Sequence, residues 1–143
     1  MTRQALLDLA ARCEAATGAD RELDANVAAA ARIGLPLGCD WALKFPNWEG
    51  AHGGVVRIII NINGNGYYIA GTFKSPAYTA SLDAAMSLVP EGWGVNLTRH
   101  IVTTAGCTVT KNSGMGWKVE AATPALALTA AYLRALAQEI EHD

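Results

Sequence analysis

The chain has 143 residues, of which 51% are hydrophobic and 17% charged, with a formal net charge of -2. This composition excludes a disordered chain, and the length fits a single domain over 1–143. The charge provides no broad basic field, so we expect no general binding to nucleic acid. The cysteines are far apart and lack Cys-x-x-Cys spacing, which argues against a disulfide framework and against a metal site.

The N-terminal sequence does not have the pattern of a signal peptide. Asp8 and Glu14 interrupt its apolar residues, and no stretch approaches the ~20 apolar residues of a membrane span. We therefore expect a cytoplasmic protein without membrane contact, in which the cysteines stay reduced.

Two amphipathic helices are predicted before Gly34. In the first, apolar residues recur at helical spacing from Leu6 to Ala16, and Gly18 ends the helix. Asp20 is placed to cap the second helix. The apolar stripe of the second helix comprises Leu23, Val27, Ala30 and Ala31. Because this stripe is mostly alanine, the helix can approach its neighbour closely.

A block of strand-like sequence follows the two helices. Cys39–Phe45 mixes apolar and polar residues as a strand does, and the glycine-rich stretch 46–54 predicts a mobile loop. Val55–Ile62 and Tyr67–Phe73 flank an Asn-Gly turn, which is the strongest hairpin signal in the chain. Since Val55–Ile62 is almost continuously apolar, we expect a central strand with both faces covered.

The stretch from Ser75 to Trp93 predicts a short helix between two prolines. Thr79 or Ser81 caps it, and Asp83 lies in its first turn, where the helix dipole favours a carboxylate. Its predicted buried stripe comprises Leu82, Ala85, Met86 and Val89.

Three further strand segments and a long helix complete the chain. Apolar and polar residues alternate over 93–102 and 107–111, and a glycine-rich turn leads to a strand at 117–121. Thr123 and Pro124 are the cap and first residue of a helix that runs to about Glu141. Its predicted core stripe comprises Leu126, Ala130, Leu133, Ala137 and Ile140.

This order of elements predicts an α+β fold. There is no regular alternation of strands and helices, and the hairpin turns favour antiparallel pairing. We predict an alpha-beta-alpha sandwich, a mainly antiparallel sheet of about five to six strands on which the N- and C-terminal helices pack.

Three segments are the most distinctive in the sequence: 16–24 (ATGADRELD), 78–93 (with YTASLDAA and LVPEGW) and 122–128 (ATPALAL). Together they resemble the phage ABA sandwich domain, a family of small bacteriophage accessory proteins. The resemblance implies a helix, sheet, helix sandwich encoded by a phage or prophage, located in the cytoplasm of the infected bacterial host. It supplies no functional residues, and Cys39–Phe73 matches no motif of the family.

Polar residues on the strands and aromatic residues near them are the candidate ligand-binding set. Such residues can donate hydrogen bonds to an anionic or nucleotide-like ligand and stack on its base. The set comprises Trp48, Arg57, Asn61, Tyr67, Arg99, His100, Lys111 and Trp117. A solvated sheet face or a subunit interface would explain the same pattern.

No residue pattern predicts a catalytic site or a cofactor. The turn at 63–66 lacks the Gly-Lys-Ser/Thr of a phosphate-binding loop, and no helix follows it. His100 and Cys107 fall on neighbouring strands, but no carboxylate is placed to orient them. Asp40, Glu49 and His52 do not have the spacing of metal ligands.

We therefore predict a non-enzymatic phage-encoded protein that captures a small anionic or nucleotide-like ligand and forms a homo-oligomer. Capture of a nucleotide would counter a nucleotide-signalled host defence. One alternative is a structural or regulatory protein that binds a host or phage protein. Another is a small hydrolase that uses His100 and Cys107.

Overall fold

The structure, a computed structural model, describes residues 3–31, 47–61, 67–99, 105–110 and 116–141. The chain divides into two compact units. Unit 1 comprises Met1–Asp20 and Ala77–Asp143, and unit 2 comprises Arg21–Pro76. Both contain helix and antiparallel sheet, so the protein is α+β, as predicted. The single domain over 1–143 stays a prediction.

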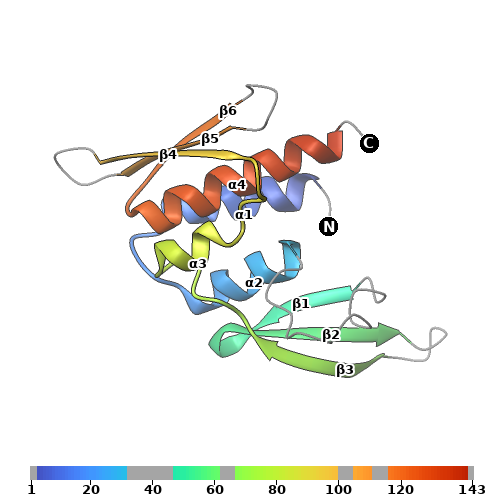
Figure 1. Cartoon of the computed structure of the whole chain (residues 1–143). Coiled ribbons are helices and arrows are strands. Elements are labelled where there is room, and N and C mark those ends of the chain that lie inside the picture. Colours follow the sequence, from blue (N-terminus) through green and yellow to red (C-terminus); the bar gives the residue numbers. More distant parts are fainter. Residues whose placement is uncertain (1–2, 32–46, 62–66, 100–104, 111–115, 142–143) are drawn as a thin grey trace. The chain divides into compact units, whose positions relative to one another are not determined.

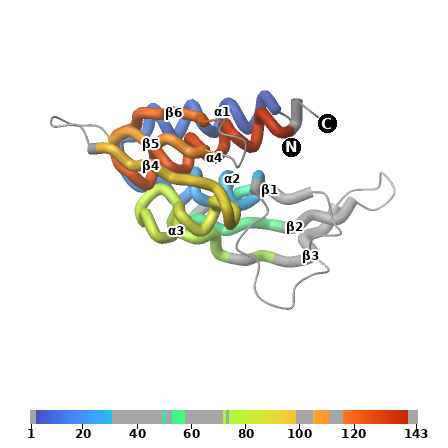
Figure 2. Tube along the Cα trace, turned by 45° about the horizontal axis from the view of Figure 1, so that its top comes forward, coloured from blue at the N-terminus to red at the C-terminus, as the bar shows by residue number. Residues whose placement is uncertain are grey.

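The described part of unit 1 contains three helices and an antiparallel sheet with strand order β4-β5-β6 (Figure 1). The elements are α1 (Arg3–Ala15), α3 (Leu82–Met86), β4 (Gly94–Arg99), β5 (Ala105–Thr110), β6 (Gly116–Ala121) and α4 (Pro124–Glu141). The helix α4 packs on β5 and β6, and α1 runs antiparallel beside α4. Figure 2 shows the same grouping of α1, α4, β5 and β6 from another direction.

The core of unit 1 lies between α4 and one face of this sheet. Cys107 of β5 and Val119 of β6 are paired on that face and buried. The predicted core residues of α4 that are buried are Leu126, Ala130, Leu133 and Ala137, and the side chain of Ile140 lies outside the described part. Within the described ranges, no helix is long and apolar enough to cross a membrane.

Hydroxyl side chains cap two helices of unit 1. The Ser81 Oγ accepts a hydrogen bond from the Ala84 N–H at 3.2 Å, so Ser81 rather than Thr79 caps α3. The Thr123 Oγ1 accepts from the Leu126 N–H at 3.2 Å at the start of α4. The predicted starts of both helices are therefore confirmed.

The predicted buried stripe of α3 is wrong at Met86, whose side chain is 42% exposed. The helix has only 5 residues and buries Ala85. Ser87 is the C-cap of α3, and in the turn that follows, Leu88 rather than Met86 is buried.

In its described residues, unit 2 has one α-helix and a second antiparallel sheet, with strand order β1-β2-β3 (Figure 1). The elements are α2 (Arg21–Ala31), β1 (Asn47–Ala51), the 3-10 turn η2 (His52–Gly54), β2 (Val55–Asn61) and β3 (Tyr67–Lys74). The hairpin and the central position of β2 are as predicted. The residues of the Asn-Gly turn and the predicted strand Cys39–Phe45 lie outside the described residues.

The predicted loop at 46–54 is wrong, because Asn47–Ala51 forms strand β1, which pairs in continuous register with β2. The glycines that suggested a loop have other roles. A Cβ at Gly50 would lie only 3.1 Å from the carbonyl carbon of Ala25, so glycine lets α2 approach the strand closely. Gly53 and Gly54 have φ angles of 72° and 79°, which this turn requires.

The helix α2 covers one face of the unit 2 sheet. Val56, which is paired with Gly50, is fully buried on that face. On the other face Arg57 is half-buried and its partner Thr72 is exposed. This face is therefore open to solvent at Thr72, and the expectation that both faces of the central strand are covered stays a prediction.

A partly buried ion pair within α2 is linked by a hydrogen bond to the residue that follows β3. The Arg21 Nη1 donates to the Asp24 Oδ2 at 2.7 Å, and the Arg21 Nη2 donates to the Ser75 carbonyl oxygen at 2.7 Å. The Ser75 Oγ in turn donates to the Gly54 carbonyl oxygen at 2.8 Å. Because the side chain of Asp24 is 0% exposed, this arrangement fixes the first turn of α2 against the sheet.

Candidate functional site

The predicted ligand-binding residues fall in both units. Unit 2 contains Trp48, Arg57, Asn61 and Tyr67, and unit 1 contains Arg99, His100, Lys111 and Trp117. His100 and Lys111 lie outside the described residues. Neither unit by itself brings the whole set together.

The sheet of unit 2 brings three of the predicted positions to one face. Asn61 is paired with Tyr67, and Arg57 is four residues before Asn61 in the same strand. Because side chains alternate between the faces of a strand, these three positions share a face. Trp48 is paired with Ile58, so its position belongs to the opposite face.

The sheet of unit 1 has a polar face on the side away from α4. Asn96, Thr108 and Lys118 form one row across the three strands. Asn96 and Lys118 are exposed, and so are Thr98 and Glu120 in the next row. This face offers hydrogen-bonding groups to solvent, as the strand alternation predicts.

The indole ring of Trp117 is part of an aromatic cluster. It stacks on Trp93 with 6.4 Å between ring centroids and 17° between the planes. Trp93 also contacts Tyr132 of α4, with centroids 6.0 Å apart. Burial, with a contribution from Glu139, raises the pKa of the Tyr132 hydroxyl. One face of Trp117 is therefore used in packing, and its predicted stacking on a ligand stays a prediction.

Cys107, the nucleophile of the hydrolase alternative, is buried in the core with 1% of its surface exposed. Burial raises the pKa of its thiol from 9.0 to about 11. The thiolate is the reactive form of cysteine, so near neutral pH this side chain is a poor nucleophile. This environment is that of a structural cysteine.

We expect the Cys107 thiol to resist labelling in the folded protein. In a Cys39→Ser background, Cys13 and Cys107 should react with a thiol reagent near neutral pH only after denaturation, because both are buried.

As pH rises from 9.0 toward 11, the unfolded chain loses the Cys107 proton before the folded chain does, so the free energy of unfolding should fall. Urea denaturation across this pH range tests the sign.

Two cysteine variants provide the controls for this experiment. In Cys107→Ala, the free energy of unfolding should fall less as the pH rises, because the thiol with the raised pKa is gone. In Cys13→Ala, the fall that comes from Cys107 should remain. Rapid labelling of Cys107 in the folded state would contradict the burial of its thiol.

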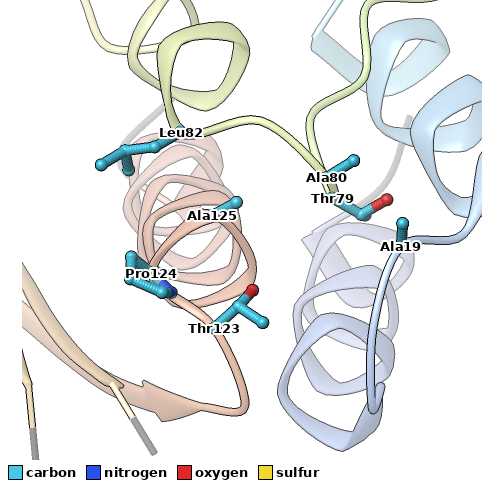
Figure 3. Close-up of a pocket in the computed structure, with 7 residues that line it drawn as sticks. All are labelled: Ala19, Thr79, Ala80, Leu82, Thr123, Pro124 and Ala125. Atoms are coloured by element: carbon cyan, nitrogen blue, oxygen red, sulfur yellow. The ribbon is translucent and has the colours of Figure 1, made fainter.

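A cavity of about 270 Å³ lies in unit 1 where three chain segments meet (Figure 3). It is lined by Ala19, Thr79, Ala80, Leu82, Thr123, Pro124 and Ala125. Ala19 follows α1. Thr79 and Ala80 precede α3, and Leu82 is the first residue of α3. Thr123 precedes α4, and Pro124 and Ala125 are its first residues. Its volume is just below the roughly 300–1,000 Å³ typical of ligand pockets.

Hydrogen bonds hold the walls of the cavity in place. The Thr79 Oγ1 accepts from the Asp20 N–H at 2.8 Å and donates to the Asp20 carbonyl oxygen at 3.2 Å. The Thr129 Oγ1 donates to the Ala125 carbonyl oxygen at 2.8 Å and lies 3.3 Å from the Tyr78 carbonyl oxygen. The connection after α1, the approach to α3 and the first turns of α4 are thus linked around the cavity.

The lining combines apolar surface with the start of a long helix. Methyl groups, a leucine side chain and a proline ring supply the apolar surface, and no lining residue carries a charge. The first turn of the 18-residue helix α4 presents the positive end of its dipole there. A small group with negative charge and some apolar surface suits this environment. In the described part of the chain, no group of three or more His, Cys, Asp or Glu residues could hold a metal ion.

Sequence reasoning did not predict this cavity, because its residues are typical of helix caps and helix starts. The available signal was the set of segments 16–24, 78–93 and 122–128, which are distinctive and far apart in sequence. The structure shows that residues from all three line one cavity.

Comparison of the chain with family models, with curated proteins and with solved structures finds no match. The class that the fold defines is a small α+β protein, with antiparallel sheet in each of the two units that the described residues form. The resemblance to the phage ABA sandwich domain stays a prediction.

Proposed function

We propose that this protein is a non-enzymatic phage-encoded binding protein that captures a small anionic ligand. The cavity at the start of α4 is the observation that carries the proposal. Capture of a nucleotide-like molecule would let the protein counter a nucleotide-signalled host defence in the cytoplasm of the infected bacterium. The proposal includes the alpha-beta-alpha sandwich with a sheet of five to six strands that the sequence predicts.

The chemistry of the lining supports an anion over a cation. No carboxylate lines the cavity to attract a cation, and the α4 dipole favours negative charge at this end of the helix. The Thr79 and Thr123 hydroxyls are engaged with Asp20 and with the Leu126 N–H, which keeps the polar part of the lining in a fixed geometry. The size suits one carboxylate or phosphate group with a short apolar part, such as the phosphate end of a nucleotide-like ligand.

Release of bound molecules tests the proposal directly. The purified full chain is incubated with a panel of nucleotides, phosphate and small carboxylates, washed, and denatured by heat, and the released molecules are identified by mass spectrometry. We expect at least one anion to be retained and recovered chemically unchanged. Recovery of no anion from the panel would contradict the proposal, and conversion of a panel member would indicate an enzyme.

Substitution of Ala80 locates the site. Ala80 is exposed and lines the cavity, so Ala80→Glu places a carboxylate at the site without burying it. We expect binding of the retained anion to weaken by about tenfold or more, because a repulsion of about 1.4 kcal/mol is enough for that factor. Isothermal titration calorimetry measures the change.

Ala11→Glu is the matched control, because Ala11 is an exposed alanine on α1 outside the cavity lining and the variant has the same net charge. Its affinity should equal that of the original protein. Equal affinity in the Ala80→Glu variant would place the ligand elsewhere.

A further inference from the structure

The edge of the unit 1 sheet at β4 differs from the edge at β6. β4 is paired with β5 and is at the end of its sheet in the described part of the chain. An edge strand presents backbone N–H and C=O groups that can pair with another strand. Proteins commonly protect such edges with charged residues, proline or bulges.

In β6 two exposed charged residues, Lys118 and Glu120, have this effect. In β4 the sequence from Gly94 to Thr98 contains neither a charge nor a proline, and its pairing with β5 is regular.

The apolar face of the sheet also continues onto β4. Leu97 forms one row with Cys107 and Val119 on the face that α4 covers. Cys107 and Val119 are buried, but Leu97 is 37% exposed. The sheet therefore has an uncovered apolar position directly beside an unprotected edge.

We propose that two copies of this chain pair through β4 in an antiparallel, two-fold symmetric dimer with one continuous sheet. An axis perpendicular to the sheet leaves the α4-covered faces of both copies on the same side. The Leu97 side chains of the two copies then lie on the same face near the axis and cover each other. This inference does not depend on the proposed ligand.

The charge distribution along β4 favours a second copy as the occupant. Arg99 is the only charged residue of the strand and lies at its end. Antiparallel pairing places the two Arg99 residues at opposite ends of the interface, whereas parallel pairing would place them side by side. Two copies of the neutral stretch from Gly94 to Thr98 can therefore pair in the antiparallel direction without bringing like charges together.

The oligomeric state of the full chain tests this proposal. Analytical ultracentrifugation over a concentration series should show a monomer–dimer equilibrium. Leu97→Lys should raise the dimer dissociation constant by about tenfold or more, because it places like charges together at the interface. Met86→Lys is the matched control, since Met86 is an exposed apolar residue of unit 1, 42% exposed on α3, and it should leave the dimer intact.

Thr98→Lys provides a second variant on the opposite, polar face of the strand, where Thr98 is exposed. If the far-ultraviolet circular dichroism spectrum shows that Leu97→Lys does not fold, Thr98→Lys tests the dimer interface in its place. Hydrogen exchange gives an independent measure, and the β4 amides that point away from β5 should be protected at high concentration and lose protection on dilution. A monomer at every concentration would overturn the proposal, as would a dimer that both lysine variants of β4 leave unchanged. Association of β4 with a peptide while the chain stays monomeric would also overturn it.

Discussion

Arg21→Met is expected to lower the free energy of unfolding of unit 2 by about 1–3 kcal/mol, the range for taking one hydrogen-bond donor from a buried acceptor. The Asp24 carboxylate is 0% exposed and would lose its hydrogen bond to the guanidinium at 2.7 Å. The Ser75 carbonyl oxygen would lose the Arg21 Nη2 donor at the same time. Methionine keeps most of the apolar stem, so the change isolates the charged group.

Hydrogen exchange of the β2 amides measures this effect within unit 2. Arg12→Met is the matched control, because Arg12 is exposed on α1 and its replacement should change stability by no more than about 0.5 kcal/mol. A loss in Arg21→Met that is no larger than in Arg12→Met would show that the ion pair contributes little.

Glycine variants test the same contacts by a second route. A Cβ at Gly54 would lie 2.5 Å from the Arg21 Nη2, whereas a Cβ at Gly53 would meet nothing within 4 Å. Both glycines have positive φ, so both alanine variants carry the conformational cost. Gly54→Ala should therefore be the more destabilising of the two, because it also displaces the Arg21 side chain.

Leu133→Ala is expected to destabilise unit 1 by about 2–5 kcal/mol, the usual cost of truncating a buried leucine and leaving a cavity. Leu133 is 0% exposed on α4, the helix that contacts α1, α3 and the sheet of this unit. Because the packing around α4 comes from several elements, it cannot easily close over the lost methyl groups.

Leu136→Ala is the matched control for this prediction, since Leu136 lies on the same helix but is only half-buried. Its cost should be clearly smaller. Exchange of the β5 amides reports on unit 1, and these amides should respond to Leu133→Ala more than the β2 amides do. An equal loss in both leucine variants would show that burial at Leu133 does not determine the stability of unit 1.

Local signals in the sequence predicted the ends of the helices well. The caps at Ser81 and Thr123 join residues three positions apart, and Pro124 is the first residue of α4, as its fixed φ favours. The hairpin β2–β3 also follows from local sequence, because β-branched and aromatic residues flank a turn motif.

Local signals misled the interpretation where a neighbouring element decides the structure. The glycines of 46–54 predict a loop, yet Gly50 is needed because α2 packs against β1. Periodicity placed Met86 in the core, but α3 ends there. For the polar residues of the predicted ligand-binding set, strand alternation gives the face of a sheet but not the unit to which the sheet belongs.

The sequence by itself determined where the helices begin and which segments form hairpins, because those preferences arise from interactions within a few residues. Only the tertiary structure decided that β1 is a strand, that Asp24 is buried, and that three distant segments line one cavity. These features depend on contacts across the chain, such as Thr79 with Asp20, 59 residues apart, and Arg21 with Ser75, 54 residues apart. No local pattern encodes such contacts, since they form only when the elements pack.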